Sequence, residues 1–137
     1  MIHAIFGRRY TFSAAHRLHS DQLSVEENRL AYGKCNNPHG HGHNYVLEVQ
    51  CAGEVDAETG MVINLATLDE IVHRTVISRF DHTNLNLDPL FEKAVPTTEN
   101  LTIAVFELLE PEILKTGCKL AKLRIEETEN NFFEYSR

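Results

Sequence analysis

The sequence has no tryptophan, only three cysteines and four prolines, and no long apolar run. None of its apolar stretches approaches the roughly 20 residues that a membrane-spanning helix needs. The first ten residues carry His3, Arg8 and Arg9 and lack the apolar centre of a signal peptide. We therefore expect a cytoplasmic protein without a membrane partner.

Runs of lysine and arginine are also missing, and the formal net charge is -7. These two features argue against nucleic acid or an anionic membrane as the main partner. A phosphorylated small molecule is compatible with them, because a binding site can be locally basic. The cysteines Cys35, Cys51 and Cys118 are odd in number and widely spaced, which fits free thiols better than a disulfide framework. The length suits one domain covering residues 1–137.

Alternation of apolar and polar side chains predicts the strands. A turn at 56–60 would join the second strand to the third and form a hairpin. The predicted segments are 2–16, 45–51, 61–63, 122–127 and 132–136.

Helical spacing of apolar residues follows Asn64, a good N-cap, and predicts a first helix to about Arg79. Thr97-Thr98-Glu99 opens a second helix that Pro111 should kink or end. Ser24 could start a short helix inside a polar insertion at 19–33. The order of these elements indicates an α+β fold, with helices covering one face of an antiparallel sheet.

The segment Cys35-Asn36-Asn37-Pro38-His39-Gly40-His41-Gly42-His43 carries a thiol and three imidazoles just before a strand. Side chains alternate along an extended chain, so His41 and His43 share the apolar face of that strand. His16 ends the apolar face of the first strand. Histidines at strand ends often only cover a surface patch, but three imidazoles and an open position are typical of a catalytic zinc site. We therefore predict Zn²⁺ bound by His16, His41 and His43.

Cys35 has three interpretations, namely a zinc ligand, a buried apolar residue or a catalytic thiol acting as base or nucleophile. Its position in a loop disfavours the buried apolar residue. The pair Asp81-His82 follows the first helix, where the carboxylate could orient the imidazole, although such pairs are also ordinary in turns.

Glu127 shares the apolar face of its strand, where an unpaired carboxylate would be costly. It needs either a Lys or Arg partner or a ligand with adjacent N–H donors, such as a pterin or guanine ring. Thr98 and Glu99 are good helix-starting residues whatever else they do.

These motifs together resemble the 6-pyruvoyl-tetrahydropterin synthase and 6-carboxy-tetrahydropterin synthase family along nearly the whole chain. The matching text is FSAAHRLHS, EEN, GKCNNPHGHGHNY, ETGMVINLATL, FDHTNLNLD, PTTEN and EETENN. The resemblance implies the tunnelling fold, with an antiparallel four-stranded sheet, two helices on one face and an oligomeric barrel. It also implies a homohexamer, a dimer of trimers, with active sites between subunits.

The activity implied by the resemblance is a zinc-dependent lyase that converts 7,8-dihydroneopterin triphosphate to 6-pyruvoyl-tetrahydropterin with loss of triphosphate. In that scheme His16, His41 and His43 hold zinc, and Cys35 is the base. Asp81 with His82 forms a relay, and the pterin is held by Glu127, Thr98 and Glu99.

One departure from the family pattern concerns His39, where biopterin-pathway members carry Asn. It permits a second spacing, Cys-x3-His-x-His through His39 and His41, which is that of 6-carboxy-tetrahydropterin synthases of queuosine biosynthesis. The context GHNY after the cluster favours the longer spacing, with His39 as an extra imidazole outside the ligand set. A non-catalytic pterin- or metal-binding paralogue is a lower alternative, and an unrelated zinc hydrolase is disfavoured because no HExxH carboxylate accompanies the histidines.

Overall fold

A computed structural model describes residues 2–137. Its sheet has the order β3-β1-β2-β4-β5 and is antiparallel except where β3 meets β1. The strands are β1 (His3–His16), β2 (His41–Glu54), β3 (Thr83–Asn84), β4 (Lys119–Thr128) and β5 (Asn131–Tyr135). The predicted α+β fold is confirmed. The sheet has five strands where four were expected, because β3 has only two residues and is too short to show alternating apolar and polar side chains.

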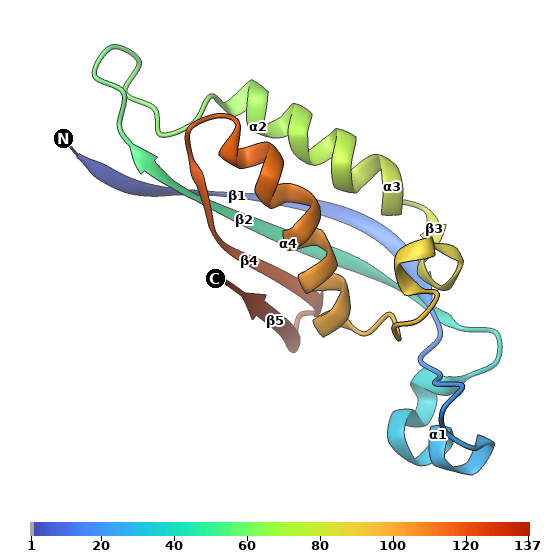
Figure 1. The fold of residues 1–137 in the computed structure, drawn as a ribbon. Helices are drawn as coiled ribbons and strands as arrows, with labels where there is room; N and C mark the ends of the chain where they lie inside the picture. The colour runs from blue at the N-terminus through green and yellow to red at the C-terminus, as the bar shows by residue number, and fades with distance from the viewer. Residues whose placement is uncertain (1) are drawn as a thin grey trace.

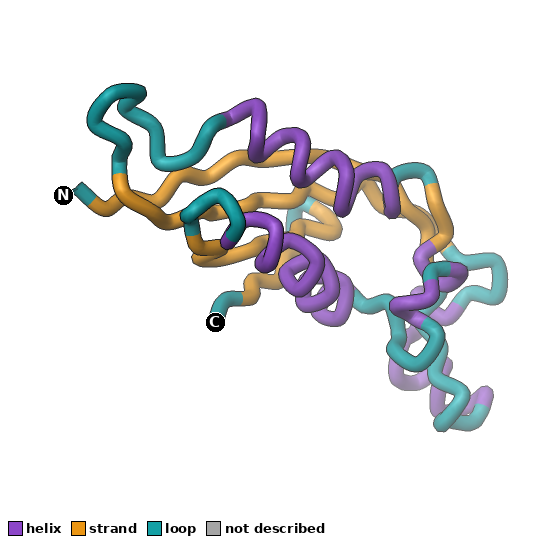
Figure 2. Tube along the Cα trace, turned by 45° about the horizontal axis from the view of Figure 1, so that its top comes forward, coloured by secondary structure: helices purple, strands orange, loops and turns teal. Residues whose placement is uncertain are grey.

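The helices that cover the sheet lie on one face, as Figures 1 and 2 show. One is a continuous helical segment made of α2 (Leu65–Val72), a π-helical turn (His73–Ile77) and α3 (Ser78–Phe80). The other is α4 (Thr98–Leu114). Both begin where the sequence predicts, because the side chains of Asn64 and Thr97 accept bonds from the backbone of the first turn.

The core lies between these helices and the sheet. The apolar residues of β2 that alternate from Tyr45 to Cys51 are fully buried, as are Leu123 and Ile125 of β4. On β1, Tyr10, Phe12 and Ala14 face the same side. This parity places the residues that continue it at the strand ends, His16 and His43, on the helix-covered face.

Two local predictions are wrong. Residues 61–63 form no strand, because Asp56 accepts the backbone bonds of a compact turn and Ile63 packs into the core ahead of α2. Pro111 does not end α4, which continues to Leu114.

The polar insertion between β1 and β2 forms α1 (Val25–Tyr32) followed by a 3₁₀ turn (Gly33–Asn36). Ser24 and Glu27 close a capping box, and the buried side chain of Asn28 bonds the carbonyls that precede α1. Figure 1 places α1 at the end of the sheet where β1 stops and β2 starts. Within residues 2–137, no helix is both long and apolar enough to cross a bilayer.

Candidate active site

The site is built where β1 ends and β2 begins. His16 and His41 are register partners across these two strands, and His43 follows two residues later on the same face. The turn into β2 needs Gly40, since its φ is 71° and a Cβ there would lie 3.0 Å from the carbonyl oxygen of His16. One ligand nitrogen from each histidine lies within 4.8 Å of the other two. The structure therefore brings the three predicted ligands together.

The ring of His16 is 1% exposed, and its orientation is set by the backbone of a distant loop. Its Nδ1 lies 2.8 Å from the carbonyl oxygen of Pro96, so Nδ1–H donates and Nε2 keeps a free lone pair. Nε2 lies 3.1 Å from Nε2 of His41. Burial lowers the pKa of His16, and the bond to Pro96 opposes that shift only in part. The ring is thus neutral and aimed at the centre of the cluster.

The environment of His43 indicates whether the cluster suits a cation. Its Nε2 is buried and, among the described residues, has no hydrogen-bond partner. Burial lowers the pKa of His43, whereas Glu127, whose Oε1 lies 3.6 Å from Nε2, raises it. A neutral imidazole with an unpartnered buried nitrogen is costly alone, but it is what a divalent metal ion requires of a ligand. The side chain of His39 is exposed and lies outside the cluster.

Glu127 lies between the histidines and a cavity of about 640 Å³. Its Oε2 accepts a bond of 2.5 Å from the hydroxyl of Thr98, at the start of α4. Among the described residues, no Lys or Arg pairs with Glu127, so the alternative of a structural salt bridge to such a side chain is not realised. Glu99 lines the same cavity, together with the aromatic rings of Tyr32 and Phe133. A carboxylate in a partly aromatic cavity suits a flat ligand that carries N–H groups.

Cys35 lies in the 3₁₀ turn after α1 and is half-buried. Burial raises the pKa of its thiol, and the negative charge of Glu127 raises it further. The thiol is therefore protonated unless positive charge comes close to it. The other two thiols belong to the core, since Cys51 is buried and Cys118 donates to the carbonyl of Val62 at 3.0 Å.

Asp81 and His82 lie just before β3, at the edge of the sheet beside the end of β1. Oδ1 of Asp81 accepts from the backbone N–H of Ser13 at 2.9 Å, and its Oδ2 lies 3.7 Å from Nε2 of His82. His82 has a φ of 59° and an exposed side chain. Among the described residues, neither side chain is bonded to Cys35 or to the three histidines. His82 and His43 border one cavity of about 460 Å³, so a single chain brings this predicted relay near the cluster without a bond to it.

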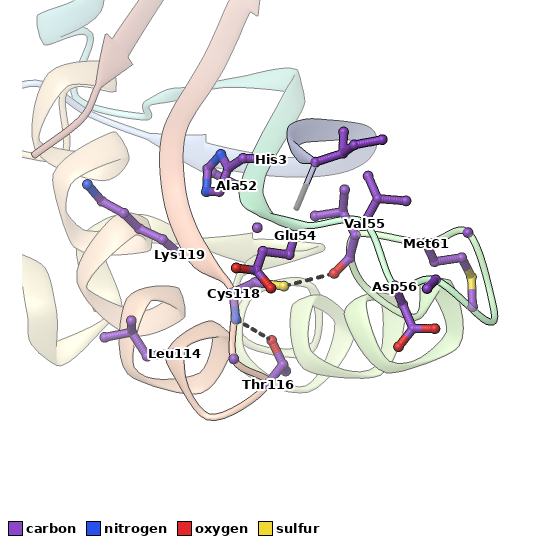
Figure 3. Close-up of a pocket in the computed structure, with 16 residues that line it drawn as sticks. His3, Ala52, Glu54, Val55, Asp56, Met61, Leu114, Thr116, Cys118 and Lys119 are labelled. Carbon is purple, nitrogen blue, oxygen red and sulfur yellow. Dashed lines mark hydrogen bonds between the residues drawn. The ribbon is translucent and has the colours of Figure 1, made fainter.

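Another cavity, of about 1030 Å³, lies at the other end of the sheet (Figure 3). It is bordered by the start of β1, the end of β2 and the turn before β4, with His3, Glu54, Cys118 and Lys119 among its residues. It contains none of the predicted site residues. Within residues 2–137, His16, His41 and His43 form the one cluster with metal-ligand spacing.

Sequence reasoning missed two groups that surround His16. One is the carbonyl of Pro96, and the other is the buried hydroxyl of Tyr45, 3.3 Å from Nδ1. A main-chain carbonyl leaves no signal in the residue type. Tyr45 could have been noticed, because it is the polar aromatic residue that follows the histidines with the same parity.

Comparison with known proteins gives a consistent result. A family model described as 6-pyruvoyl tetrahydropterin synthase matches residues 6–137. The human 6-pyruvoyl tetrahydrobiopterin synthase is 46% identical over 129 residues, covering 93% of this chain and 88% of the relative. A candidate 6-carboxy-5,6,7,8-tetrahydropterin synthase of Archaeoglobus fulgidus is 32% identical over 133 residues, covering 97% and 96%.

A solved structure of Caenorhabditis elegans 6-pyruvoyl tetrahydropterin synthase superimposes with a TM-score of 0.94 at 44% identity, covering 100% of this chain and 97% of that one. The sequence match, the fold and the family model agree over nearly the whole length. The chain belongs to the 6-pyruvoyl tetrahydropterin synthase family.

Proposed function

We propose that this protein is a zinc-dependent lyase that converts 7,8-dihydroneopterin triphosphate to 6-pyruvoyl-tetrahydropterin with loss of triphosphate. The observation that carries the proposal is the placement of Glu127 between the three-histidine cluster and the cavity at the start of α4. A ring held by this carboxylate would present its side chain to the cluster. The 46% identity to the human synthase supports the same reaction.

His16, His41 and His43 would hold the zinc ion, because they offer three imidazole nitrogens close together without a competing carboxylate ligand from the chain. The bound ion would polarise the side-chain hydroxyl groups of the substrate and make the carbon-bound proton easier to remove.

The chain's own groups then have separate tasks. Glu127 accepts hydrogen bonds from the amino and ring N–H groups of the pterin, while Thr98 fixes one carboxylate oxygen and Glu99 borders the ring. Cys35 takes the proton from the side-chain carbon. Its thiol is protonated in the protein alone, so this role requires the positive charge of the loaded site nearby.

The relay of Asp81 and His82 would act on a site shared with another subunit. The exposed side chain of His82 supports this placement. Among the described residues, β5 has no strand beyond it and β1 pairs with β3 at only two positions, so both long edges of the sheet could pair with other copies. A homohexamer made of two trimers would pair the edges of the sheet and would let one subunit present Asp81 and His82 to the site of another. Analytical ultracentrifugation of the 15.6 kDa chain measures the number of subunits directly.

The second candidate is the 6-carboxy product, favoured by the Cys35-x3-His39-x-His41 spacing and by the similarity to the archaeal relative. The exposed position of His39 outside the cluster supports the pyruvoyl product instead. The deciding experiment incubates the purified protein with dihydroneopterin triphosphate and identifies the product by mass. A 6-carboxy product with acetaldehyde would replace the first proposal, and binding of pterin without turnover would identify a non-catalytic paralogue.

A further inference from the structure

A tyrosine hydroxyl lies against the imidazole of His16 on the side away from the other histidines' nitrogens. Oη of Tyr45 is 3.3 Å from Nδ1 of His16, and the side chain of Tyr45 is 0% exposed. Among the described residues, this hydroxyl has no other hydrogen-bond partner. Buried tyrosine hydroxyls normally find a polar partner, and here the chain offers only the ring of a candidate metal ligand.

The carbonyl of Pro96 decides which of the two groups donates. A carbonyl oxygen can only accept, and this one lies 2.8 Å from Nδ1 of His16, so Nδ1 carries the hydrogen. The oxygen of Tyr45 therefore accepts the same N–H, which is shared between two acceptors. Nε2, 3.1 Å from His41, keeps the lone pair that a metal ion needs. Two acceptors on different elements thus fix the tautomer and the orientation of the His16 ring.

Tyr45 is itself rigidly placed. Its ring stacks on that of Phe12, its register partner on β1, with 5.1 Å between centroids and 19° between planes. The same ring packs edge-on against His43, at 5.7 Å between centroids and 68°. His43 and Tyr45 share the helix-covered face of β2, so the tyrosine lies between the cluster and the apolar core. One immobile side chain therefore contacts two of the three candidate ligands.

Acceptors on the outer nitrogen of a ligating imidazole matter for metal binding. They orient the ring and raise the basicity of the nitrogen that binds the ion, and their removal typically costs 10 to 100-fold in affinity. The bond of His16 to Tyr45 is longer than its bond to Pro96, so loss of the hydroxyl should have an effect near the lower end of this range.

We propose that Tyr45 is a positioning residue of the metal site. Its hydroxyl holds the His16 ring with Nε2 aimed at the ion, and its aromatic ring supports His43. Tyr45 supplies no ligand atom to the cluster and acts through the two imidazoles. This role rests on the proposed metal binding by the three histidines.

The test compares Tyr45→Phe with the wild type, because this change removes one oxygen and keeps the ring that stacks on Phe12. Zinc affinity, measured by competition with a chelating dye, should fall about tenfold. Co²⁺ bound in place of zinc absorbs visible light with bands that depend on ligand geometry, and these bands should shift in the variant. Thermal melting of the metal-free proteins checks that both are folded.

The matched control is Tyr10→Phe. Tyr10 lies on the same face of β1, and its hydroxyl donates to Asp69 at 2.7 Å, away from the histidines. Loss of this shorter bond to a carboxylate should lower the melting temperature at least as much as Tyr45→Phe does. Zinc affinity should stay within about twofold of the wild type, and the cobalt bands should not move.

Wild-type zinc affinity or unchanged cobalt bands in Tyr45→Phe would overturn the role of Tyr45, and so would an equal loss of affinity in Tyr10→Phe. A wild-type protein that binds neither ion would instead remove the three-histidine site and the proposed function with it. The two failures are distinguishable, because the first leaves metal binding by the wild type intact.

Discussion

At the scale of single residues, His16 is the most constrained side chain of the candidate site. It is 1% exposed, its Nδ1 faces the Pro96 carbonyl and its Nε2 faces His41. His43 differs, because its buried Nε2 has no hydrogen-bond partner among the described residues. A cation that bound both nitrogens would satisfy an otherwise costly buried group.

The first prediction concerns the metal ligands. His41→Ala should abolish binding of zinc at one equivalent per chain, because two imidazoles cannot complete the site. His39→Ala should bind zinc like the wild type, since the side chain of His39 is exposed and lies outside the cluster. Metal analysis after dialysis measures both. Loss of zinc in His39→Ala with retention in His43→Ala would move the site to the shorter spacing.

The second prediction concerns Cys35. Cys35→Ala should keep zinc and fold, because the thiol is half-buried and makes no bond that holds the turn among the described residues. Its turnover of dihydroneopterin triphosphate should fall about 10² to 10⁴-fold if the thiol is the base. Product formation under single-turnover conditions measures the loss. A variant that loses its zinc would instead identify Cys35 as a ligand.

At the scale of elements, β1 and β2 could be predicted because one face of each is apolar and the other polar. The two-residue β3 could not, since pairing of Thr83 with Ala14 depends on where α3 ends. The parity that predicts the strands also places the three histidines on one face. The Asp81-His82 pair shows the limit, because the sequence indicates which residues could react but not whether they contact Cys35 or the histidines within one chain.

The segment between α3 and α4 gives the third prediction. Arg79 donates two bonds to Asp88, at 2.9 and 2.8 Å, and these bonds lower the pKa of Asp88 although its burial opposes the shift. A lowered pKa means that the pair stabilises the fold above the unfolded value of about 3.9, and that this contribution disappears as the pH falls through the folded value. Asp88→Asn should therefore be less stable at pH 7 by about 1 to 3 kcal/mol.

Below the folded pKa of Asp88 the two proteins should have nearly equal stability, because the wild-type carboxyl is then neutral as well. Urea unfolding at pH 7 and at pH 3 measures both values. An equal loss at both pH values would mean that the amide disturbs packing and that the charge of Asp88 contributes little.

At the scale of the whole molecule, the metal should contribute to stability, because its ligands come from two strands joined by the α1 insertion. An ion present at a hundredfold excess over its Kd adds about 2.7 kcal/mol. The fourth prediction is that a chelator lowers the melting temperature by roughly 5 to 15 °C. His41→Ala is the control, and its melting temperature should not respond to the chelator. An identical response in both proteins would mean that the chelator acts elsewhere.

The bond between His16 and the Pro96 carbonyl links the metal site to the start of α4. Thr97, the next residue, caps that helix and accepts bonds from the amides of Asn100 and Leu101. A bound ion would fix the His16 ring, and through its bond to Pro96 it would slow local opening of the first turn of α4. This would occur although α4 supplies no metal ligand. Amide hydrogen exchange at Asn100 and Leu101 would then report metal occupancy from a distance, without any measurement of catalysis.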